Sequence, residues 1–296
     1  MKRLQGMEEA APAKINLSLR VLRRRDDGFH EIETRMAPIS LYDSLQVEPA
    51  DAFEFRADDP TLPMGEDNLV VRAAQAFFAA TATDGVSVHL RKMIPHGAGL
   101  GGGSSDAAST LLALDRLFET NLTREALAKL AEPLGSDVPF FLFGGLALCE
   151  GRGERVTALS SHWPGTMRWL LLLKPAISVS TAAVFRNLPA SDYTDGMYSR
   201  AVCTALHAGQ TPELEDLHNC FERSVLETYP EVALSREVLL CSGASFVRLS
   251  GTGPTLFAPF SDLTMAQKVQ KQLQTQGYEV YLSRAIHPND GIVSVF

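Results

Sequence analysis

Hydrophobic and polar residues alternate in the segment 12–22, close to the N-terminus. The apolar positions are Ile15, Leu17, Leu19 and Val21, and the polar positions between them are Lys14, Asn16, Ser18 and Arg20. Successive side chains of a β-strand point to opposite faces, so a period of two predicts a strand with one face in the core. We therefore expect a half-buried strand that presents Lys14 and Asn16 side by side on its polar face.

The rest of the first half is predicted to mix strands and helices. The patterns indicate extended segments over 29–41, 44–48 and 86–91, a hairpin region up to residue 55, and helices over 68–80, 105–118 and 123–132. Asn68 or Asp67 is suited to cap the first of these helices, and Thr123 is suited to cap the third. A loop over 134–139 and an apolar run over 140–149 follow.

A polar, proline-containing stretch over 160–165 is typical of a domain junction, so we expect two domains, 1–163 and 164–296. The second half is predicted to begin with a buried strand over 169–174 and a short helix capped by Ser180. Helices are then expected over 214–228 and 230–241. The last segments indicate strand, strand, helix and strand over 245–249, 255–260, 264–276 and 278–286, which favours a compact antiparallel sheet.

Five glycines fall within the seven residues 97–103, between a predicted strand and a predicted helix. Glycine lets backbone N–H groups approach an anion and adopts positive φ, and the N-terminus of the helix adds its unpaired N–H groups and positive dipole. We expect Ser104 or Ser105 to cap this helix. The segment therefore predicts a phosphate cradle, against the alternative of a plain glycine-rich turn.

Other phosphate-binding motifs fit less well. The spacing of Gly97, Gly99 and Gly102 matches G-x-G-x-x-G, but the next predicted element is a helix and not the strand that a dinucleotide-binding fold requires, so that interpretation is a minor alternative. No Gly-Lys-Ser or Gly-Lys-Thr is present, which excludes a P-loop. The motifs of protein kinases are also absent from the sequence.

Composition narrows the possible partners. The formal net charge is −8, which argues against nucleic acid or an acidic membrane as a partner, so an anionic ligand must be held by local geometry. Four scattered cysteines without C-x-x-C spacing suit a reducing cytoplasm and give no sign of a metal site. We see no signal peptide and no apolar run long enough to span a bilayer, and we expect a cytoplasmic protein.

A few side chains outside the glycine-rich segment are candidates for chemistry. Asp137 precedes the apolar run 140–143, where a carboxylate needs a partner; the alternative is an ordinary turn or cap residue. Taken alone, Lys14 is expected to be a lysine on the solvent-exposed face of an edge strand. The loop 250–254, Ser-Gly-Thr-Gly-Pro, either offers N–H groups to a phosphate or forms a tight hairpin. The run 23–25 of three arginines is expected to be a solvated loop, against the alternative of a binding patch.

Three motifs together resemble the GHMP kinase superfamily, which includes galactokinase, homoserine kinase, mevalonate kinase and phosphomevalonate kinase. They are Pro-Ala-Lys-Ile-Asn-Leu at 12–17, the segment Pro95 to Ser105, and Ser-Gly-Thr-Gly-Pro at 250–254. The resemblance implies an α+β fold of two domains: a half like ribosomal protein S5 domain 2 that binds ATP, and a ferredoxin-like half. The active site would lie between them.

Within the superfamily the chain resembles the kinases that phosphorylate the 2-hydroxyl of 4-diphosphocytidyl-2-C-methyl-D-erythritol in the non-mevalonate isoprenoid pathway. The residues that carry this likeness are Asp-Gly-Phe-His-Glu at 27–31, Gly-Ser-Asp-Val-Pro-Phe-Phe at 135–141, Gly-Gly-Leu-Ala at 144–147 and Val-Ser-Thr-Ala-Ala-Val-Phe at 179–185. They occur in the order found in that family, and the likeness spans nearly the whole chain.

The resemblance also implies roles for single residues. Asp137 would be the base toward the acceptor hydroxyl, and Lys14 would be its partner near the transferred phosphate. The ATP site would consist of Asn68, Leu69 and Val70 near the adenine and of Pro95, Gly97, Gly99, Leu100, Gly101, Gly102, Gly103, Ser104 and Ser105 around the phosphates. The acceptor site would consist of Asn16, Phe29, His30, Thr181, Phe185, Gly251 and Thr252, with His30 hydrogen-bonded to cytosine and the rings of Phe29 and Phe185 on its two faces.

Some expectations concern cofactors and departures from the family. ATP is the expected co-substrate and Mg²⁺ is expected to accompany it, but the sequence names no protein ligand for the metal. Asp106 follows the glycine-rich segment and is expected to interact with the helix dipole and not with a metal. Many relatives carry Tyr where this chain has Phe29, so the phenolic hydroxyl is lost.

The substrate is expected to be a small molecule, with no nucleic acid and no membrane as partner, and the chain is expected to be a monomer or a weak homodimer. Two other functions stay open: a sibling kinase for an alcohol such as homoserine or mevalonate, and a nucleotide-binding protein without transfer activity. The aromatic set argues against the first, and the presence of both Lys14 and Asp137 argues against the second.

Overall fold

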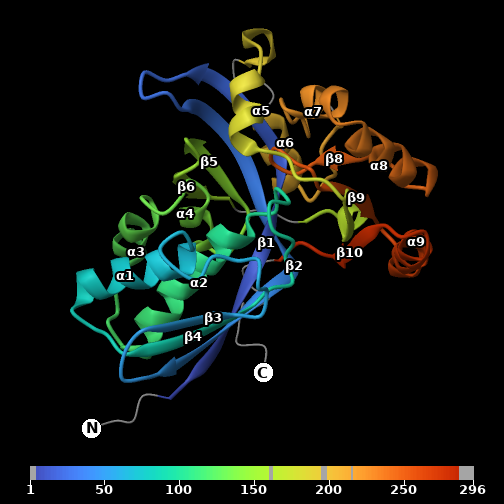
Figure 1. Cartoon of the computed structure of the whole chain (residues 1–296). Coiled ribbons are helices and arrows are strands. Elements are labelled where there is room, and N and C mark those ends of the chain that lie inside the picture. Colours follow the sequence, from blue (N-terminus) through green and yellow to red (C-terminus); the bar gives the residue numbers. More distant parts are fainter. Residues whose placement is uncertain (1–4, 160–162, 195–198, 215, 287–296) are drawn as a thin grey trace.

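The computed structural model describes residues 5–159, 163–194, 199–214 and 216–286. Two β-sheets form the framework, one in each half of the chain, and helices pack on both (Figure 1). The predicted α+β fold class is confirmed. The boundary predicted after residue 163 falls between the last strand of the first sheet and the first strand of the second, and its exact place stays a prediction.

The first sheet is built around one long antiparallel pair. Its strands are β1 (Met7–Arg24), β2 (His30–Pro49), β3 (Glu54–Ala57), β4 (Val86–Arg91), β5 (Ala147–Gly151) and β6 (Arg155–Ala158). They lie in the order β3-β4-β2-β5-β6, and β1 pairs with the other edge of β2; β3 and β4 are parallel and the remaining pairs antiparallel. The two extended segments expected over 29–48 are one continuous strand, because β1 gives β2 a partner along nearly its whole length.

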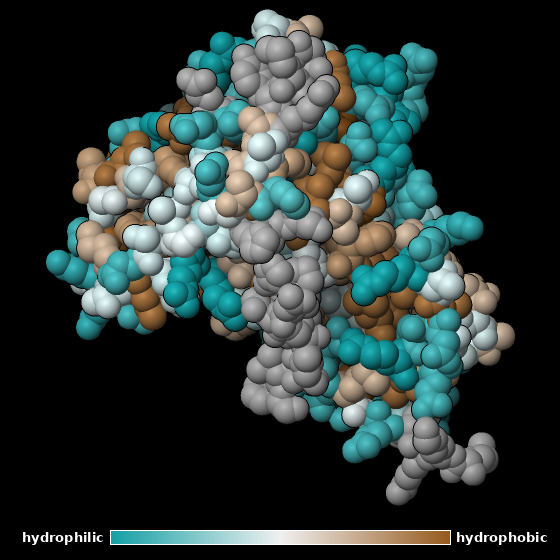
Figure 2. Space-filling view, turned by 180° about the vertical axis from the view of Figure 1, so that it is seen from behind, coloured by the Kyte–Doolittle hydropathy of each residue, from teal (hydrophilic) through white to brown (hydrophobic). Residues whose placement is uncertain are grey.

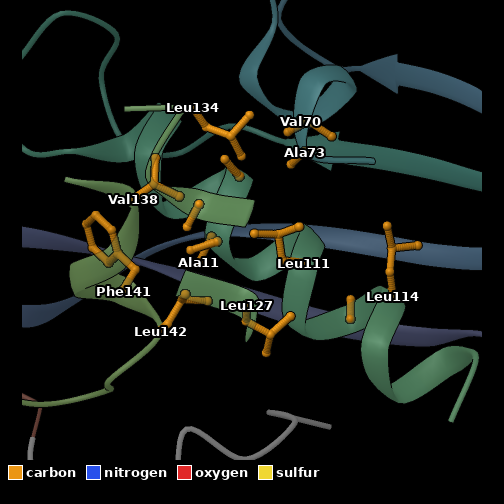
Figure 3. Packing of buried hydrophobic residues seen from close by; sticks show 14 of the residues in the cluster. Ala11, Val70, Ala73, Leu111, Leu114, Leu127, Leu134, Val138, Phe141 and Leu142 are labelled. Carbon is orange, nitrogen blue, oxygen red and sulfur yellow. The ribbon is translucent and has the colours of Figure 1, made fainter. Parts of the chain in front are cut away.

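Four helices cover one face of this sheet: α1 (Leu69–Thr81), α2 (Gly102–Leu117), α3 (Arg124–Ala131) and α4 (Val138–Phe141). The predicted caps of α1 and α3 are confirmed, because the Asn68 side chain accepts the N–H of Val70 and the Thr123 side chain accepts the N–H of Ala126. Apolar residues from these helices and the strands make one cluster, part of which is drawn in Figure 3. The short helix α4 was not predicted: the sequence pattern put 138–139 in a loop and 140–141 in an apolar run. Pro139 stands in its first turn, where the ring is tolerated.

The second sheet has the order β10-β7-β9-β8, all antiparallel, as predicted for the C-terminal segments. Its strands are β7 (Trp169–Lys174), β8 (Arg248–Leu249), β9 (Leu256–Phe260) and β10 (Glu279–Ser283). The helices of this half are α5 (Thr181–Asn187), α6 (Ser199–His207), α7 (Glu222–Thr228), α8 (Pro230–Cys241) and α9 (Leu263–Thr275). Short 3₁₀ turns occupy Gly165–Met167 and Ala190–Asp192.

The helix predicted over 214–228 was wrong at its start, and α6 was missed. Helix α7 begins at residue 222 because residues 218–220 bond to β1: the N–H of Leu19 donates to the His218 carbonyl, and the N–H of Cys220 donates to the Leu19 carbonyl. The Asn219 side chain also donates to the carbonyls of Leu249 and Gly251. These long-range bonds have no trace in the local pattern.

The β1–β2 hairpin connects the two halves. Its apolar residues Ile15 and Leu17 pack with Leu170, Leu172 and Phe257 of the second sheet. The hairpin extends upward between the two halves in Figure 1. Consequently β1 is buried on both faces, and the expected wet polar face was wrong: the side chains of Lys14, Asn16, Ser18 and Arg20 are all buried.

The surface seen from behind is mixed, with hydrophilic residues over much of the outline and hydrophobic residues near the middle (Figure 2). No helix in the described part of the chain is long and apolar enough to cross a membrane.

Candidate active site

Most of the sequence-predicted site residues lie around one cleft of about 1090 Å³. Strands β1 and β2, the glycine-rich segment, the start of α2, residues 136–137, α5 and the loop between β8 and β9 all contribute to its wall. The predicted residues that line it are Lys14, Asn16, Phe29, His30, Asn68, Leu69, Pro95, Gly97, Gly99, Gly101, Gly102, Gly103, Ser104, Asp137, Thr181, Phe185, Gly251 and Thr252. Segments more than 200 residues apart in the chain therefore share one cavity.

Lys14 is held at the centre of a polar network. Its ammonium group donates to the Asn16 side-chain oxygen at 2.6 Å and to the Gly99 carbonyl at 3.0 Å, and it lies 3.6 Å from a carboxylate oxygen of Asp137. The Asn16 amide in turn donates to the Thr34 hydroxyl, which donates to the Ser18 carbonyl. Because the lysine is 4% exposed, this network fixes its position.

Asp137 opens toward the cleft. Its side chain is 34% exposed, and although the residue precedes α4, its carboxylate makes no capping hydrogen bond. The alternative that the Asp137 side chain caps a helix is therefore wrong. A carboxylate with one cationic neighbour and an open side has the geometry to accept a proton from a bound hydroxyl.

The glycine-rich segment needs glycine at three alternate positions. Gly97, Gly99 and Gly101 have φ of 63°, 75° and 72°, a region that other residues rarely adopt. A β-carbon at Gly99 would overlap the Ser250 carbonyl oxygen, and one at Gly101 would lie 3.0 Å from the Lys14 side chain. The segment is therefore packed tightly against both Lys14 and the second glycine loop.

The start of helix α2 differs from the prediction. Gly101 occupies the N-cap position in the left-handed region, and α2 begins at Gly102, so Ser104 and Ser105 lie inside the first turn and do not cap the helix. Glycine at these positions brings no side chain between the free N–H groups and the cleft. The anion-binding end of the helix thus directly faces the cavity.

Three residues expected in the ATP site do not line the cleft. The side chains of Val70, Leu100 and Ser105 are buried in the protein, and the Leu100 carbonyl accepts a hydrogen bond from the backbone N–H of Lys14. Asn68 lines the cleft, but both ends of its amide are engaged, with the N–H of Val70 and the carbonyl of Pro63.

The second glycine loop, between β8 and β9, packs against the first. The Ser250 hydroxyl donates to the Gly99 carbonyl at 3.0 Å, and the Thr252 hydroxyl lies 3.0 Å from that of Thr181 on α5. Gly251 has φ of 59°. The loop is more than a tight hairpin, because it joins the phosphate segment to the second half of the chain.

A buried cluster of Lys92 and two aspartates adjoins the start of α2. The Lys92 ammonium bonds both Asp43 and, at 2.8 Å, Asp106. Burial is the largest influence on Asp106; together with the nearby Asp43 carboxylate it outweighs the attraction of Lys92 and raises the pKa of Asp106 to about 8. The expectation of a helix-dipole role for Asp106 was wrong, because the residue lies beyond the first turn of α2 and pairs with Lys92.

Aromatic residues gather at the other end of the cleft. The rings of His30 and Phe185 lie 5.4 Å apart, and Phe185 packs on Phe221 at 4.6 Å. Phe29 is 52% exposed and lies under the guanidinium of Arg152 at 5.1 Å. Burial, with a smaller contribution from the charge of Arg24, lowers the pKa of His30 below its ordinary value, which favours the neutral ring.

Several residues that line the cleft were not singled out from the sequence. They are Thr34, Lys92, Arg152, Arg186 and Tyr193, and Arg24 was considered only as part of the run 23–25. Tyr193 lies edge-on to His30 at 6.0 Å and comes from a segment with no pattern that would indicate it. Arg186 directly follows Phe185, so its position next to a candidate aromatic residue was a signal that could have been used.

Comparisons with known protein families agree with this geometry. The family model "GHMP kinases N terminal domain" matches residues 68–145, and the model "GHMP kinases C terminal" matches residues 204–279. The first match includes the glycine-rich segment and Asp137.

Curated relatives cover almost the whole chain. The 4-diphosphocytidyl-2-C-methyl-D-erythritol kinase of Pelotomaculum thermopropionicum is 39% identical over 94% of this chain and 97% of its own length. The kinase of the same name from Bacillus subtilis is 38% identical over 94% and 96% of the two chains.

Solved structures give the same answer for the fold. A crystal structure of 4-(cytidine 5'-diphospho)-2C-methyl-D-erythritol kinase superposes with a TM-score of 0.80 at 36% identity, covering 95% of this chain and 99% of that one. The homoserine kinase of Cytophaga hutchinsonii superposes with a TM-score of 0.72 at 20% identity, covering 97% and 98%, which is a likeness of fold alone.

Proposed function

This chain belongs to the 4-diphosphocytidyl-2-C-methyl-D-erythritol kinase family of GHMP kinases, and from that premise we propose that it transfers the γ-phosphoryl group of ATP to the 2-hydroxyl of that alcohol. The observation that carries the proposal is the position of the Lys14–Asp137 pair, at 3.6 Å, in the same cleft as the glycine-rich start of α2 and the aromatic residues around His30. One cavity thus combines a carboxylate suited to act as general base, a glycine-rich segment suited to phosphate, and room for a nucleobase.

The mechanism follows from these positions. Asp137 orients the acceptor hydroxyl and takes its proton as the oxygen attacks the γ-phosphorus of ATP in line. Lys14, fixed by Asn16 and the Gly99 carbonyl, stabilises the negative charge that develops on the transferred group. The N–H groups at the start of α2 and of the glycine-rich segment hold the other phosphate oxygens.

ATP is the co-substrate of GHMP kinases, and we propose that Mg²⁺ enters with it. Within the described ranges no group of three or more histidine, cysteine, aspartate or glutamate residues is placed to hold a metal ion. Mg²⁺ keeps several waters and binds through a few carboxylates plus substrate phosphates, so the residues present fit an ion carried mainly by ATP. We therefore derive no step of the reaction through it.

We propose that the enzyme works on its small-molecule substrate in the cytoplasm, without nucleic acid or membrane, as a monomer or weak homodimer. All four cysteines are free, which suits a reducing compartment.

The direct test incubates the protein with Mg-ATP and a panel of alcohols, and measures ADP release. We expect turnover with 4-diphosphocytidyl-2-C-methyl-D-erythritol and none with homoserine or mevalonate, because neither of these has a base to place beside His30. Release of ADP with homoserine or mevalonate at a comparable kcat/KM would replace this proposal with the sibling-kinase function. Failure with every alcohol, despite ATP binding, would favour a nucleotide-binding protein without transfer activity.

A further inference from the structure

A chain of hydrogen bonds runs from a backbone carbonyl of β1 through Thr34 to Lys14. The Thr34 hydroxyl donates to the Ser18 carbonyl at 2.7 Å and accepts from the side-chain amide of Asn16 at 2.8 Å. The oxygen of the same amide accepts from the Lys14 ammonium at 2.6 Å. The residues Thr34, Asn16 and Lys14 are at most 4% exposed, so these bonds are shielded from bulk water.

The donors and acceptors give this chain of bonds one direction. An ammonium group has donors only, so the atom of Asn16 that meets Lys14 is the amide oxygen, and the NH₂ group faces Thr34. A threonine hydroxyl has a single proton, and that of Thr34 goes to the Ser18 carbonyl, so toward Asn16 the hydroxyl can only accept. Both neighbours therefore hold the amide in the same orientation, and turning it over would bring its NH₂ group against the ammonium.

An irregularity in the β1–β2 pair accompanies these bonds. The register shifts between Asn16 and Ser18, where Leu17 is an extra residue of β1. A bulge of this kind interrupts the ladder of backbone hydrogen bonds and re-aims the side chains beside it. At this bulge the Ser18 carbonyl accepts from a side chain of β2, that of Thr34. The alternating pattern of the sequence does not reveal such a contact.

The Asn16 amide helps to determine where the Lys14 ammonium points. Two oxygen atoms of the protein accept from this group, the Asn16 side-chain oxygen and the Gly99 carbonyl. A further N–H of the ammonium remains for the Asp137 carboxylate, 3.6 Å away, and for a phosphoryl group in the cleft. An amide without its anchor at Thr34 would rotate and leave the ammonium with a poorer acceptor.

We propose that Thr34 is a positioning residue for phosphoryl transfer, which keeps the Lys14 ammonium aimed at the reaction by holding the Asn16 amide. This inference rests on the proposed function. Thr34 borders the cleft, but its hydroxyl bonds to Ser18 and Asn16, so it acts through Asn16 and not on a substrate. In a network this deeply buried, the loss of one partner leaves a polar group that water does not satisfy.

The test compares Thr34→Val with Thr34→Ser in steady-state kinetics. Valine has the shape of threonine without its hydroxyl, so the Asn16 NH₂ group loses its acceptor, and kcat should fall by about 10-fold, the order of effect of one unpaired buried donor. Serine keeps the hydroxyl, and kcat should stay within about two-fold of the unmutated value. In both variants the KM of ATP should change by less than about two-fold, because the phosphate-binding segment is untouched.

The matched control is Thr110→Val. Thr110 is fully buried in α2, and its hydroxyl also donates to a backbone carbonyl, that of Asp106, at 2.7 Å. It takes no part in the bonds that lead to Lys14, so kcat should stay unchanged even where the melting temperature falls. Equal kcat losses in Thr110→Val and Thr34→Val would mean that any buried threonine has this effect, and would overturn the inference.

A double-variant cycle tests whether Thr34 acts through Asn16. In Asn16→Ala the amide is absent, so the addition of Thr34→Val should lower kcat by less than about two-fold instead of about 10-fold. A full further loss of about 10-fold would contradict the inference. So would equal kcat losses in Thr34→Val and Thr34→Ser, or a normal kcat in Thr34→Val.

One measurement needs neither a substrate nor a folded valine variant. In hydrogen exchange followed by NMR, the side-chain NH₂ of Asn16, identified by its loss in Asn16→Ala, should exchange far more slowly than that of Asn187, which is exposed. Exchange of both groups at the same rate would mean that the Asn16 NH₂ makes no lasting bond to Thr34, and the inference would fall.

The inference and the proposed function fail in different ways. If the unmutated protein does not phosphorylate 4-diphosphocytidyl-2-C-methyl-D-erythritol, the proposed function is wrong, and the exchange of the Asn16 NH₂ still reports on the network. If it does, and Thr34→Ser loses as much kcat as Thr34→Val, the function stands and the role of Thr34 is wrong.

Discussion

The two ends of the cleft are built from different parts of the polypeptide. The nucleotide end is mostly backbone: three glycines with positive φ, the free N–H groups of α2, and a carbonyl that accepts from Lys14. The acceptor end is mostly side chains, aromatic and cationic, that come from β1, β2, α5 and the segment around Tyr193. The first end is held by interlocking backbone contacts and suits a phosphate chain, which many substrates share. In our proposal, the second end determines which alcohol is accepted.

Between the two ends lies the Lys14–Asp137 pair, and the largest expected effect comes from changing it. Asp137→Asn keeps the shape of the side chain and removes the base, so kcat should fall by about 10²–10⁴ while ATP affinity is retained. The kcat of Lys14→Ala should fall by a similar factor. The kcat of the double variant should fall by much less than the product of the two factors, because the residues act as one unit. Steady-state kinetics and ATP titration measure this; near-normal kcat in Asp137→Asn would end the assignment.

The backbone end should be intolerant of a side chain where its glycine segment is packed tightly, as at Gly101. In Gly101→Val a β-carbon would lie 3.0 Å from the side chains of Lys14 and Phe141, at a φ of 72° that a β-branched residue avoids. ATP affinity should fall by about 100-fold or more, because the loss of a strained turn costs several kcal/mol.

The control for this prediction is Gly65→Val, since Gly65 has open space around it and an ordinary φ. Both variants need circular dichroism beside calorimetry, so that loss of binding is separated from loss of folding. A folded Gly101→Val protein with normal ATP affinity would mean that the segment is not the phosphate cradle.

Sequence reasoning succeeded best at the backbone end. The density of glycines is a local signal, and the requirement for positive φ at Gly97, Gly99 and Gly101 is a local property. Even there, the serine caps were wrong, because the left-handed Gly101 starts the helix earlier. Secondary structure was also predicted well where one pattern sufficed, as in β4, β7 and α8.

The acceptor end was harder, because its residues meet through long-range packing. Arg24 and Arg23 are indistinguishable in sequence, yet one lines the cleft and the other does not. The burial of the polar face of β1 likewise depends on elements far along the chain, and residues 218–220, whose pairing with Leu19 shortened α7, lie about 200 residues away from it. Asp137 and Lys14 were identified from a family motif, and neither stood out by itself.

The side-chain end can be weakened without touching the nucleotide end. Phe29→Ala and Phe185→Ala should each raise the KM of the acceptor about 5- to 150-fold, because stacking on a base contributes about 1–3 kcal/mol. ATP KM should stay within about two-fold. Phe29→Ala is the cleaner variant, because the ring is half exposed, whereas Phe185 also packs on Phe221. Equal increases in both KM values would contradict the division of the cleft into two ends.

A smaller effect is expected for the choice of base. If His30 hydrogen-bonds cytosine, the unmutated protein should prefer the cytidine acceptor over its uridine analogue by about 10-fold, since a mismatched buried hydrogen bond costs about 1–3 kcal/mol. His30→Ala should reduce this preference to about one, through the KM of the cytidine form. Equal kcat/KM values for the two acceptors with the unmutated protein would mean that His30 does not read the base.

The smallest expected effect is a shift in pH dependence that Arg24 controls. Burial, and then the charge of Arg24, lower the pKa of His30, so the folded protein takes up its proton at a lower pH than the unfolded chain does. The stability that this group contributes is therefore present above the ordinary histidine pKa of about 6.5 and is lost as the pH falls through the lower pKa of the folded state. Over the same pH range a charged His30 should raise the KM of the acceptor, whereas the KM of ATP should not change.

Arg24→Gln removes the charge of Arg24, so the rise of the acceptor KM on acidification should begin at a higher pH. In Arg23→Gln this rise, the acidic limb of the profile, should stay at the same pH as in the unmutated protein. If the limb of the acceptor KM is at the same pH in Arg24→Gln as in the unmutated protein, the charge of Arg24 does not act on His30, and the acceptor end is tuned by burial alone.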